Sequence, residues 1–245
     1  MINPKAFLSL PINFNDICYI YPAKVKDIVG NENFPAFRSL LTSSQEDLQD
    51  LYTEKNIQDT PPTPFEYLLS LYYNNKPVQS LIERAFYFFT HEQVIVLPMA
   101  KKIIIGTKED VAKATSLDKV KMIDEDNFFD FQNAIRLSLG EKSVERPDPD
   151  EDPRVARIKA KARYRDKIKA KKGDGLSLTA TLASICCMDF GLNPLNIGEI
   201  SYASIGTLIR YYQEKDKYHT DVSSLLAGAD SKEVHPEYWV RNIEE

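Results

Sequence analysis

The stretch TPFEYLLSLYYNNKPVQSLIERAFYFFTHEQVIVLPMAKKIIIG, residues 63–106, decides the fold class of this chain. Thr63 and Pro64 are typical of an N-cap and a first helical residue. Apolar residues then recur at helical spacing, namely Phe65, Leu68, Leu69 and Tyr72. A second helix is predicted over about 77–90, with an inward face made of Leu81, Ile82, Ala85, Phe86 and Phe89. The runs QVIVLP and KKIIIG predict a β-hairpin, so helices and strands share one domain.

Upstream of this stretch, the sequence predicts a first hairpin and one more helix. The runs FLSLPI and ICYIYP are short and apolar, and NFND between them supplies turn residues. A helix is expected from about 35 to 54, with Phe37, Leu40, Leu41, Leu48 and Leu51 on one face.

Downstream, KVKMI predicts a further strand, and Asp124 opens a helix whose acidic first turn suits the helix dipole. Phe128, Phe131 and Ile135 line this helix, and Gly140 is expected to end it. The sequence thus predicts an α+β, mainly helical chain. Its parts are an α+β domain with two short hairpins (1–141), an acidic, proline-rich linker (142–153), a basic helical connector (154–175) and a small all-α domain (176–245).

The C-terminal domain is predicted to hold two helical regions. Ser177 caps a helix that carries Leu178, Leu182, Ile185 and Cys186 and is expected to end at Gly191. A second helical region starts near Ser201, where Ile205, Leu208 and Tyr212 form its apolar face. Val222, Leu225 and Leu226 follow before Gly228, and the single tryptophan, Trp239, stands near the end.

The composition favours a folded, water-soluble protein. The chain has 245 residues, of which 43% are hydrophobic and 27% charged, as in ordinary globular domains. Its longest apolar run, VIVLPMA, is far below the roughly 20 residues that span a bilayer. We read no signal peptide, and three cysteines without framework spacing fit a reducing cytoplasm.

No catalytic or metal-binding pattern stands out in the sequence. His91, His219 and His235 lack metal-ligand spacing with the cysteines, and no glycine-rich phosphate loop is present. Cys186 and Cys187 are expected to be buried, inert thiols in an apolar helix. The acids at 148–152 are interpreted as solvated linker. We therefore expect no cofactor, no metal site and no enzymatic activity.

Most of the aromatic residues are expected in the core. The clusters FEYLLSLYY, AFYFF and NFFDF resemble stacking platforms for bases, but at helical spacing such residues usually pack inward. Tyr73, Tyr87 and Phe88 fall off the main apolar faces. They are the expected exposed aromatics and therefore candidate contacts with another protein.

The segment RVARIKAKARYRDKIKAKKG, residues 154–173, concentrates positive charge. Residues 154–172 hold 10 Lys or Arg against 1 acid, whereas residues 1–153 hold 16 against 24 and residues 173–245 hold 5 against 11. As a helix it would span about 28 Å. Three roles stay open: a connector that pairs with acidic surfaces of its own chain or oligomer, a handle for an acidic partner, or an arm for nucleic acid. Its candidate contacts are Arg157, Lys159, Lys161, Arg163, Arg165 and Lys167.

The order of these segments resembles the tail assembly chaperones and related tail-morphogenesis proteins of siphovirus-like phages and prophages of Gram-positive bacteria. The motifs that carry the resemblance are NFFDFQNAIRLSLGEK, the acidic linker, the basic segment, the GLNP turn, YYQEKDKY and LLAG. It covers residues 125–245 well and 1–124 loosely.

The resemblance implies a protein-binding role in the host cytoplasm, without a membrane. Such a chaperone would cover the apolar helical faces of the tape-measure protein and recruit tail-tube subunits through the basic segment. The residues expected at the partner surface are Tyr202, Leu208, Tyr211, Tyr212 and Tyr218. The alternative is that Leu208 and Tyr212 are core, with Tyr211 and Tyr218 merely half-covered.

Two other functions compete with the chaperone. The chain could be a structural tail or connector component that stays in the virion, or a nucleic-acid-binding protein that acts through residues 154–172. A structural component would be present in finished tails, whereas a chaperone would not. A nucleic-acid-binding protein would bind nucleic acid in a salt-sensitive way.

Overall fold

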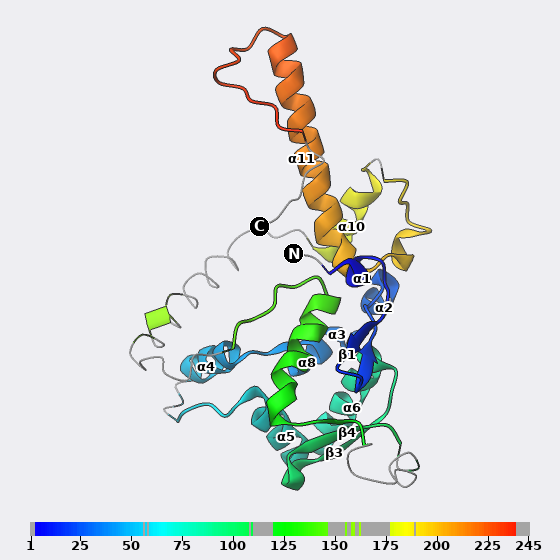
Figure 1. Cartoon of the computed structure of the whole chain (residues 1–245), viewed down its shortest axis with the longest axis vertical. Coiled ribbons are helices and arrows are strands. Elements are labelled where there is room, and N and C mark those ends of the chain that lie inside the picture. Colours follow the sequence, from blue (N-terminus) through cyan, green and yellow to red (C-terminus); the bar gives the residue numbers. More distant parts are fainter. Residues whose placement is uncertain are drawn as a thin grey trace.

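The chain is α+β and mainly helical, as the sequence predicted. The computed structural model describes residues 3–55, 57, 59–107, 109, 120–146, 155, 158–159, 162, 177–188 and 190–238. Figure 1 shows a body formed by α1 to α8 and the strands, from which one long helix, α11, extends away. We call the described residues within 3–146 the body.

The first hairpin is confirmed, but its first strand starts later than predicted. Strand β1 (Ile12–Phe14) pairs antiparallel with β2 (Cys18–Ile20), and Ile12 faces Ile20. Much of the run FLSLPI is not strand, because residues before it form helix α1 (Pro4–Phe7). Asn3 caps α1 by accepting a hydrogen bond from the Lys5 backbone N–H, and Pro4 suits the first helical position.

The single helix expected over 35–54 is wrong, because two helices occupy this region. Helix α3 (Phe34–Thr42) ends at Ser43, and α4 (Gln45–Glu54) starts after Ser44. The Ser44 side chain accepts from the Asp47 N–H while the Asp47 carboxylate accepts from the Ser44 N–H. This capping box satisfies the first amides of α4 and so favours a new helix start over continuation.

The stretch 63–106 folds as its sequence predicts. Thr63 caps helix α5 (Pro64–Asn74) in a second capping box with Glu66. Helix α6 (Lys76–Thr90) follows, and Ile82, Ala85, Phe86 and Phe89 are buried, with Leu81 half-buried. Strand β3 (Val94–Leu97), the short 3-10 turn η1 (Pro98–Ala100) and β4 (Lys102–Ile105) form the second hairpin. The predicted further strand, β5 (Met122–Ile123), pairs with β4.

Helix α8 (Glu125–Ser138) runs through the centre of the core. The helix begins after Asp124, as predicted, with Asp124 as its N-cap, and it is followed by Gly140 at φ +74°. The Phe131 ring lies 5.4 Å from the rings of both Phe14 and Phe86, so α8 joins the first hairpin to α6. These aromatic contacts and the aliphatic side chains around them form one continuous core.

The C-terminal part consists of two helices and a turn. Helix α10 (Leu178–Cys186) is capped by Ser177 as predicted, but it ends at Cys186 and not at Gly191. The 3-10 turn η3 (Ile197–Glu199) leads to α11 (Tyr202–Leu226), which is capped by Ser201 and continues unbroken through the polar stretch QEKDK. Only the base of α11 meets the body (Figure 1).

Residues around the start of α11 are joined to helix α2 (Val25–Val29) of the body. The Val25 N–H donates to the Ile200 carbonyl at 3.0 Å, and the Tyr202 N–H donates to the Ala23 carbonyl at 2.9 Å. Val25, Ile185, Ile197 and Ile205 form a small second core there. The predicted boundary between an N-terminal and a C-terminal domain stays a prediction.

Much of the predicted linker and basic connector lies outside the described residues. Within the connector, Val155, Ile158, Lys159 and Ala162 are described and are helical. In the part of the chain that the structure describes, no helix is both long and apolar enough to cross a membrane.

Candidate functional site: an aromatic groove in the body

The predicted partner-surface residues all lie on α11 and are half-buried. Tyr202 packs edge-on against Phe34 of the body, with ring centroids 6.1 Å apart. Tyr212 meets Phe190, and Tyr218 meets Tyr238 on the chain that returns beside α11. These three aromatic rings therefore already contact their own chain. A partner surface made by them together with Leu208 and Tyr211 stays a prediction.

Of the predicted basic contacts, only Lys159 belongs to the described residues. Arg157, Lys161, Arg163, Arg165 and Lys167 lie outside them, as does Trp239. The three roles of this segment, namely connector, handle for an acidic partner and arm for nucleic acid, therefore stay predictions.

The expectation of two buried thiols in α10 is wrong for Cys187. Cys186 is half-buried, but Cys187 follows the last helical residue and is exposed, since α10 ends before it. Cys18 on β2 is the buried thiol, and burial raises its pKa to about 12. Within the described ranges, no three His, Cys, Asp or Glu side chains gather closely enough to hold a metal ion.

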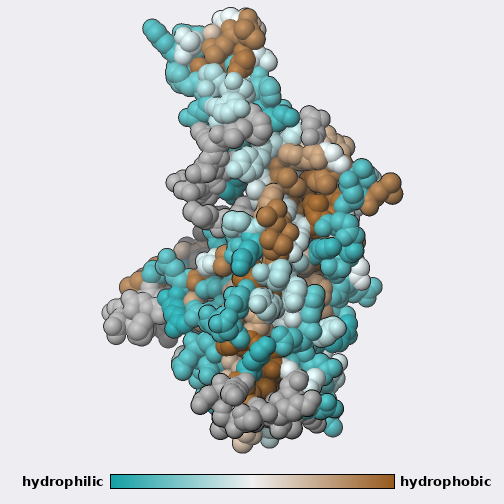
Figure 2. Space-filling model, turned by 45° about the vertical axis from the view of Figure 1, so that its right-hand side comes forward, coloured by the Kyte–Doolittle hydropathy of each residue, from teal (hydrophilic) through white to brown (hydrophobic). Residues whose placement is uncertain are grey.

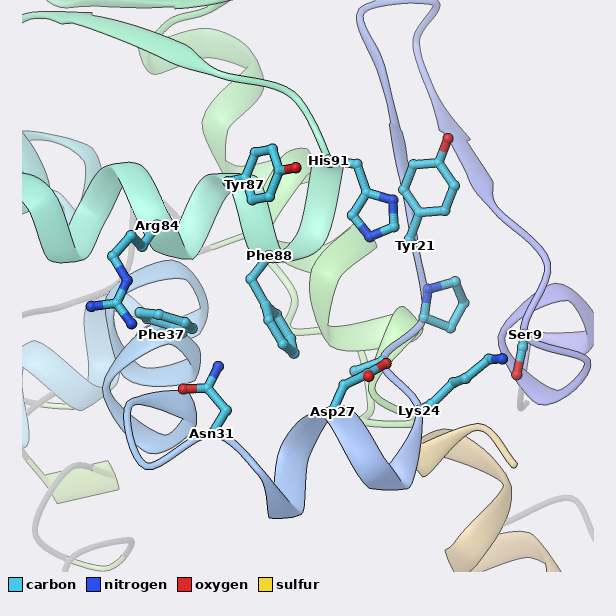
Figure 3. Close-up of a pocket in the computed structure, with 12 residues that line it drawn as sticks. Ser9, Tyr21, Lys24, Asp27, Asn31, Phe37, Arg84, Tyr87, Phe88 and His91 are labelled. Atoms are coloured by element: carbon cyan, nitrogen blue, oxygen red, sulfur yellow. The ribbon is translucent and has the colours of Figure 1, made fainter. Parts of the chain in front are cut away.

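The body contains a half-open hollow of about 650 Å³, which we call the aromatic groove (Figure 3). It lies between the outer face of α6, the end of β2 and the segment that carries α2 and the start of α3. Its lining residues are Ser9, Tyr21, Pro22, Ala23, Lys24, Asp27, Asn31, Phe37, Arg84, Tyr87, Phe88 and His91. Its volume is within the range of known ligand sites.

The outer face of α6 forms one wall of the groove. Arg84, Tyr87, Phe88 and His91 follow one another at helical spacing, on the side opposite the buried residues of α6. Tyr87 on this face is 56% exposed. Phe88 is half-buried and packs against Phe34 and Phe37 of α3, with 5.8 Å between ring centroids in each pair.

The opposite wall is tied to the end of α6 by a stacked pair of rings. The His91 imidazole lies 4.1 Å from the Tyr21 ring, nearly parallel to it. His91 has φ +56° and ends α6, while its N–H donates to the Tyr87 carbonyl. The Tyr21 N–H donates to the Phe89 carbonyl at 2.8 Å, which fixes the hairpin against the helix.

Charged side chains stand at the rim. The Arg84 guanidinium lies over the Phe37 ring, 5.7 Å from its centroid. The Lys24 ammonium is held at 3.0 Å by Glu199, which also binds Lys26 at 2.6 Å. These two hydrogen bonds, that of Lys26 first, hold the pKa of Glu199 below its usual range. Asp27 is the acidic residue of the lining.

Sequence reasoning found part of this site. It singled out Tyr73, Tyr87 and Phe88 as exposed aromatics; Tyr73 and Tyr87 are exposed, whereas Phe88 is half-buried and Tyr73 lies outside the groove. It missed Arg84 and His91, although their spacing from Tyr87 was a readable signal. It could not have found Tyr21 or Asp27, because these come from distant parts of the chain.

A second apolar surface lies near the base of α11. Figure 2 shows hydrophobic side chains gathered where α10 and η3 meet the body. Among the described residues, Leu8 and Leu195 are exposed apolar residues, and the half-buried Leu182, Met188 and Leu192 pack against the second core. The aromatic groove, with its hollow and its charged rim, is the better-defined of the two surfaces.

The chemistry of the groove suits the binding of side chains. Its aromatic faces accept apolar or aromatic groups, and the Arg84 guanidinium can donate hydrogen bonds to a carboxylate. Comparison of the chain with protein-family models, with curated proteins and with solved structures gives no match.

Proposed function

We propose that this chain is a non-enzymatic protein-binding factor that receives the apolar face of a partner helix in the aromatic groove. One observation carries the proposal. Besides the aromatic residues on its buried face, α6 has aromatic residues on its outer face, and these line a hollow. Exposed aromatic side chains around a concavity favour recognition of another protein, since they bury large areas at small entropic cost.

The biological setting that we propose is phage tail assembly in the host cytoplasm. The resemblance described above supports a tail assembly chaperone, whose partner is the tape-measure protein, the tail-tube protein or both. A tape-measure protein is long, helical and apolar on faces that the tube later covers, so a groove for an amphipathic helix suits it. A structural component that stays in the virion is the alternative.

Co-purification separates the two settings. The tagged chain is expressed with the tail genes that accompany it, and the proteins bound to it and those of finished tails are identified. A chaperone is recovered with tape-measure or tube protein and is absent from finished tails. If the chain is present in finished tails, it is a structural component. If nucleic acid alone is recovered with the chain, both the chaperone and the structural component are contradicted.

Photo-crosslinking tests whether the groove is the binding site. A benzophenone amino acid replaces Tyr87 in one variant and Tyr73 in the other. Tyr73 is the matched control, because it is 65% exposed and lies outside the groove. Crosslinks to tape-measure or tube protein are expected from position 87 alone. Equal crosslinking from both positions, or from 73 only, excludes the groove.

A further inference from the structure

Arg84 stands at one end of the aromatic groove, and Asp27 and Lys24 stand together toward the other end. Figure 3 shows the Arg84 side chain beside Phe37 at one end and the Asp27 carboxylate on the far side of Phe88. Phe88 lies between Arg84 and this pair of opposite charges. A bound segment would therefore meet a single positive charge at the Arg84 end and a mixed pair of charges at the other.

Arg84 is the cation that is available to a partner. Its guanidinium carbon lies 5.7 Å from the centroid of the Phe37 ring, and the group carries five N–H donors. Arg84 takes part in none of the ion pairs between described residues, whereas Lys24 is held by Glu199. A carboxylate on a partner is the group that the Arg84 fork fits best.

The length of the groove suits two turns of helix. From Arg84 to His91 is seven residues, or roughly 10 Å along the axis of α6. A docked helix presents residues i, i+3 or i+4, and i+7 on one face over that distance. A nucleic acid fits less well, because its phosphates call for several cations, whereas the groove offers Arg84, a Lys24 that is already paired with Glu199, and the acidic Asp27.

We propose that the groove selects an amphipathic helix that carries a large apolar or aromatic anchor over Phe88 and Tyr87 and an Asp or Glu about one turn away, at the Arg84 end. This inference rests on the proposed function and specifies the chemistry of the partner. A helix with Lys or Arg at that position is disfavoured by repulsion from Arg84.

Selection from a peptide library tests the charge order. Random 16-residue peptides are displayed and selected on the full-length chain, and the affinity of the best peptides is measured by fluorescence anisotropy. The selected sequences are expected to share an aromatic or Leu anchor with an acid at a constant offset from it. A selected peptide is then made with Lys in place of the acid.

Charge reversal in the protein supplies the matched test. Arg84→Glu is expected to lower the affinity for the acidic peptide by about fivefold, which is the size of effect expected for an exposed ion pair. The same variant is expected to bind the Lys peptide more tightly. Lys76→Glu is the control, since it makes the same change of charge at the exposed start of the same helix, outside the groove.

The outcomes separate this inference from the proposed function. If Tyr87→Asp abolishes binding while Arg84→Glu leaves it unchanged, or if no acid is selected, the charge order is wrong and the groove remains a binding site. If every selected peptide binds Tyr87→Asp as well as the wild type, or none is selected, the inference and the proposed function both fail.

Discussion

Gly140 is the residue at which the end of α8 meets the base of α11. Its φ of +74° lies in the left-handed region, and a Cβ built there would stand 2.8 Å from the Ala203 Cα and 3.0 Å from the Ala203 carbonyl oxygen. Both the turn and the close approach of α11 therefore depend on glycine. The sequence predicted the first role, as a helix end, but not the second.

Three glycine variants separate strain from steric overlap. Gly140→Ala is expected to lower the free energy of unfolding by about 3 kcal/mol, because it adds a backbone clash to the strain. Gly191 has φ +69°, and no atom lies within 4 Å of an added Cβ, so Gly191→Ala should lower the free energy of unfolding by only about 1 kcal/mol. Gly206 lies within α11, and an added Cβ would point into open space. Gly206→Ala should therefore raise the free energy of unfolding by up to about 1 kcal/mol. Urea unfolding measures all three, and equal losses at 140 and 191 would rule out the clash.

Cys18 makes the stability of the fold sensitive to alkaline pH. Burial raises the pKa of its thiol from 9.0 to about 12, so the folded chain keeps the neutral thiol. Above pH 9 the unfolded chain ionises and the folded one does not. The free energy of unfolding should therefore fall between pH 9 and 12, by up to about 1.4 kcal/mol per pH unit.

Urea unfolding at pH 8, 9 and 10 measures this slope. Cys18→Ala lowers the stability at every pH through the lost packing, but it should remove the part of the slope that belongs to the thiol. Cys187→Ala, at the exposed thiol, should keep the wild-type slope. The prediction fails if the wild type and Cys18→Ala have the same slope.

At the scale of elements, the break between α3 and α4 shows how periodicity misleads. Leu41 and Leu48 are seven residues apart, which is two helical turns, so the apolar phase continues across the break. Only the local pair of Ser44 and Asp47 marks the new helix start. Hydrogen bonding at the cap, not hydrophobic spacing, decided where the helix ends.

Ser44→Ala is expected to destabilise the chain by about 1 kcal/mol, since the Asp47 N–H loses its acceptor at the buried start of α4. Ser43→Ala is the matched control. The Ser43 hydroxyl donates only to the Ser39 carbonyl on an exposed surface, so its loss should change little. Thermal and urea unfolding measure both variants, and an equal effect would show that the capping box is not what holds this break.

At the scale of the whole molecule, a small clasp joins the base of α11 to the body. Glu199 binds Lys24 and Lys26, and the backbones of residues 23–25 and 200–202 exchange two hydrogen bonds. The same segment, through Ala23 and Lys24, lines the aromatic groove. The clasp therefore connects the position of α11 to the shape of the groove wall.

Glu199→Lys should loosen this clasp. Amide hydrogen exchange at Val25 and Tyr202, followed by NMR, is expected to become several-fold faster. High salt should act in the same direction on the wild type, because the ion pairs are exposed. Since the pKa of Glu199 is lowered, its contribution is present above about pH 4.5 and lost as the pH falls through the lowered value.

Asp130→Lys is the control for the clasp, since it makes the same change of charge at a similarly exposed ion pair, with Arg146. It should leave exchange at Val25 and Tyr202 unchanged. Equal acceleration in both variants would indicate a general loss of stability and not a loosened clasp.

The sequence by itself determined the fold class and most helix starts. Thr63 and Ser177 were predicted as N-caps, and helices were predicted to start at Asp124 and near Ser201. Such starts are readable because a cap is a hydrogen bond between residues two or three apart. The second hairpin was equally local.

Only the tertiary structure decided the groove and the clasp. Tyr21 meets His91, and Lys24 meets Glu199, 175 residues away. Such contacts depend on how separate elements pack, and no local pattern encodes that packing. The outward face of α6 was visible in the sequence, but the hollow beside it exists because β2, α2 and α3 pack around that face.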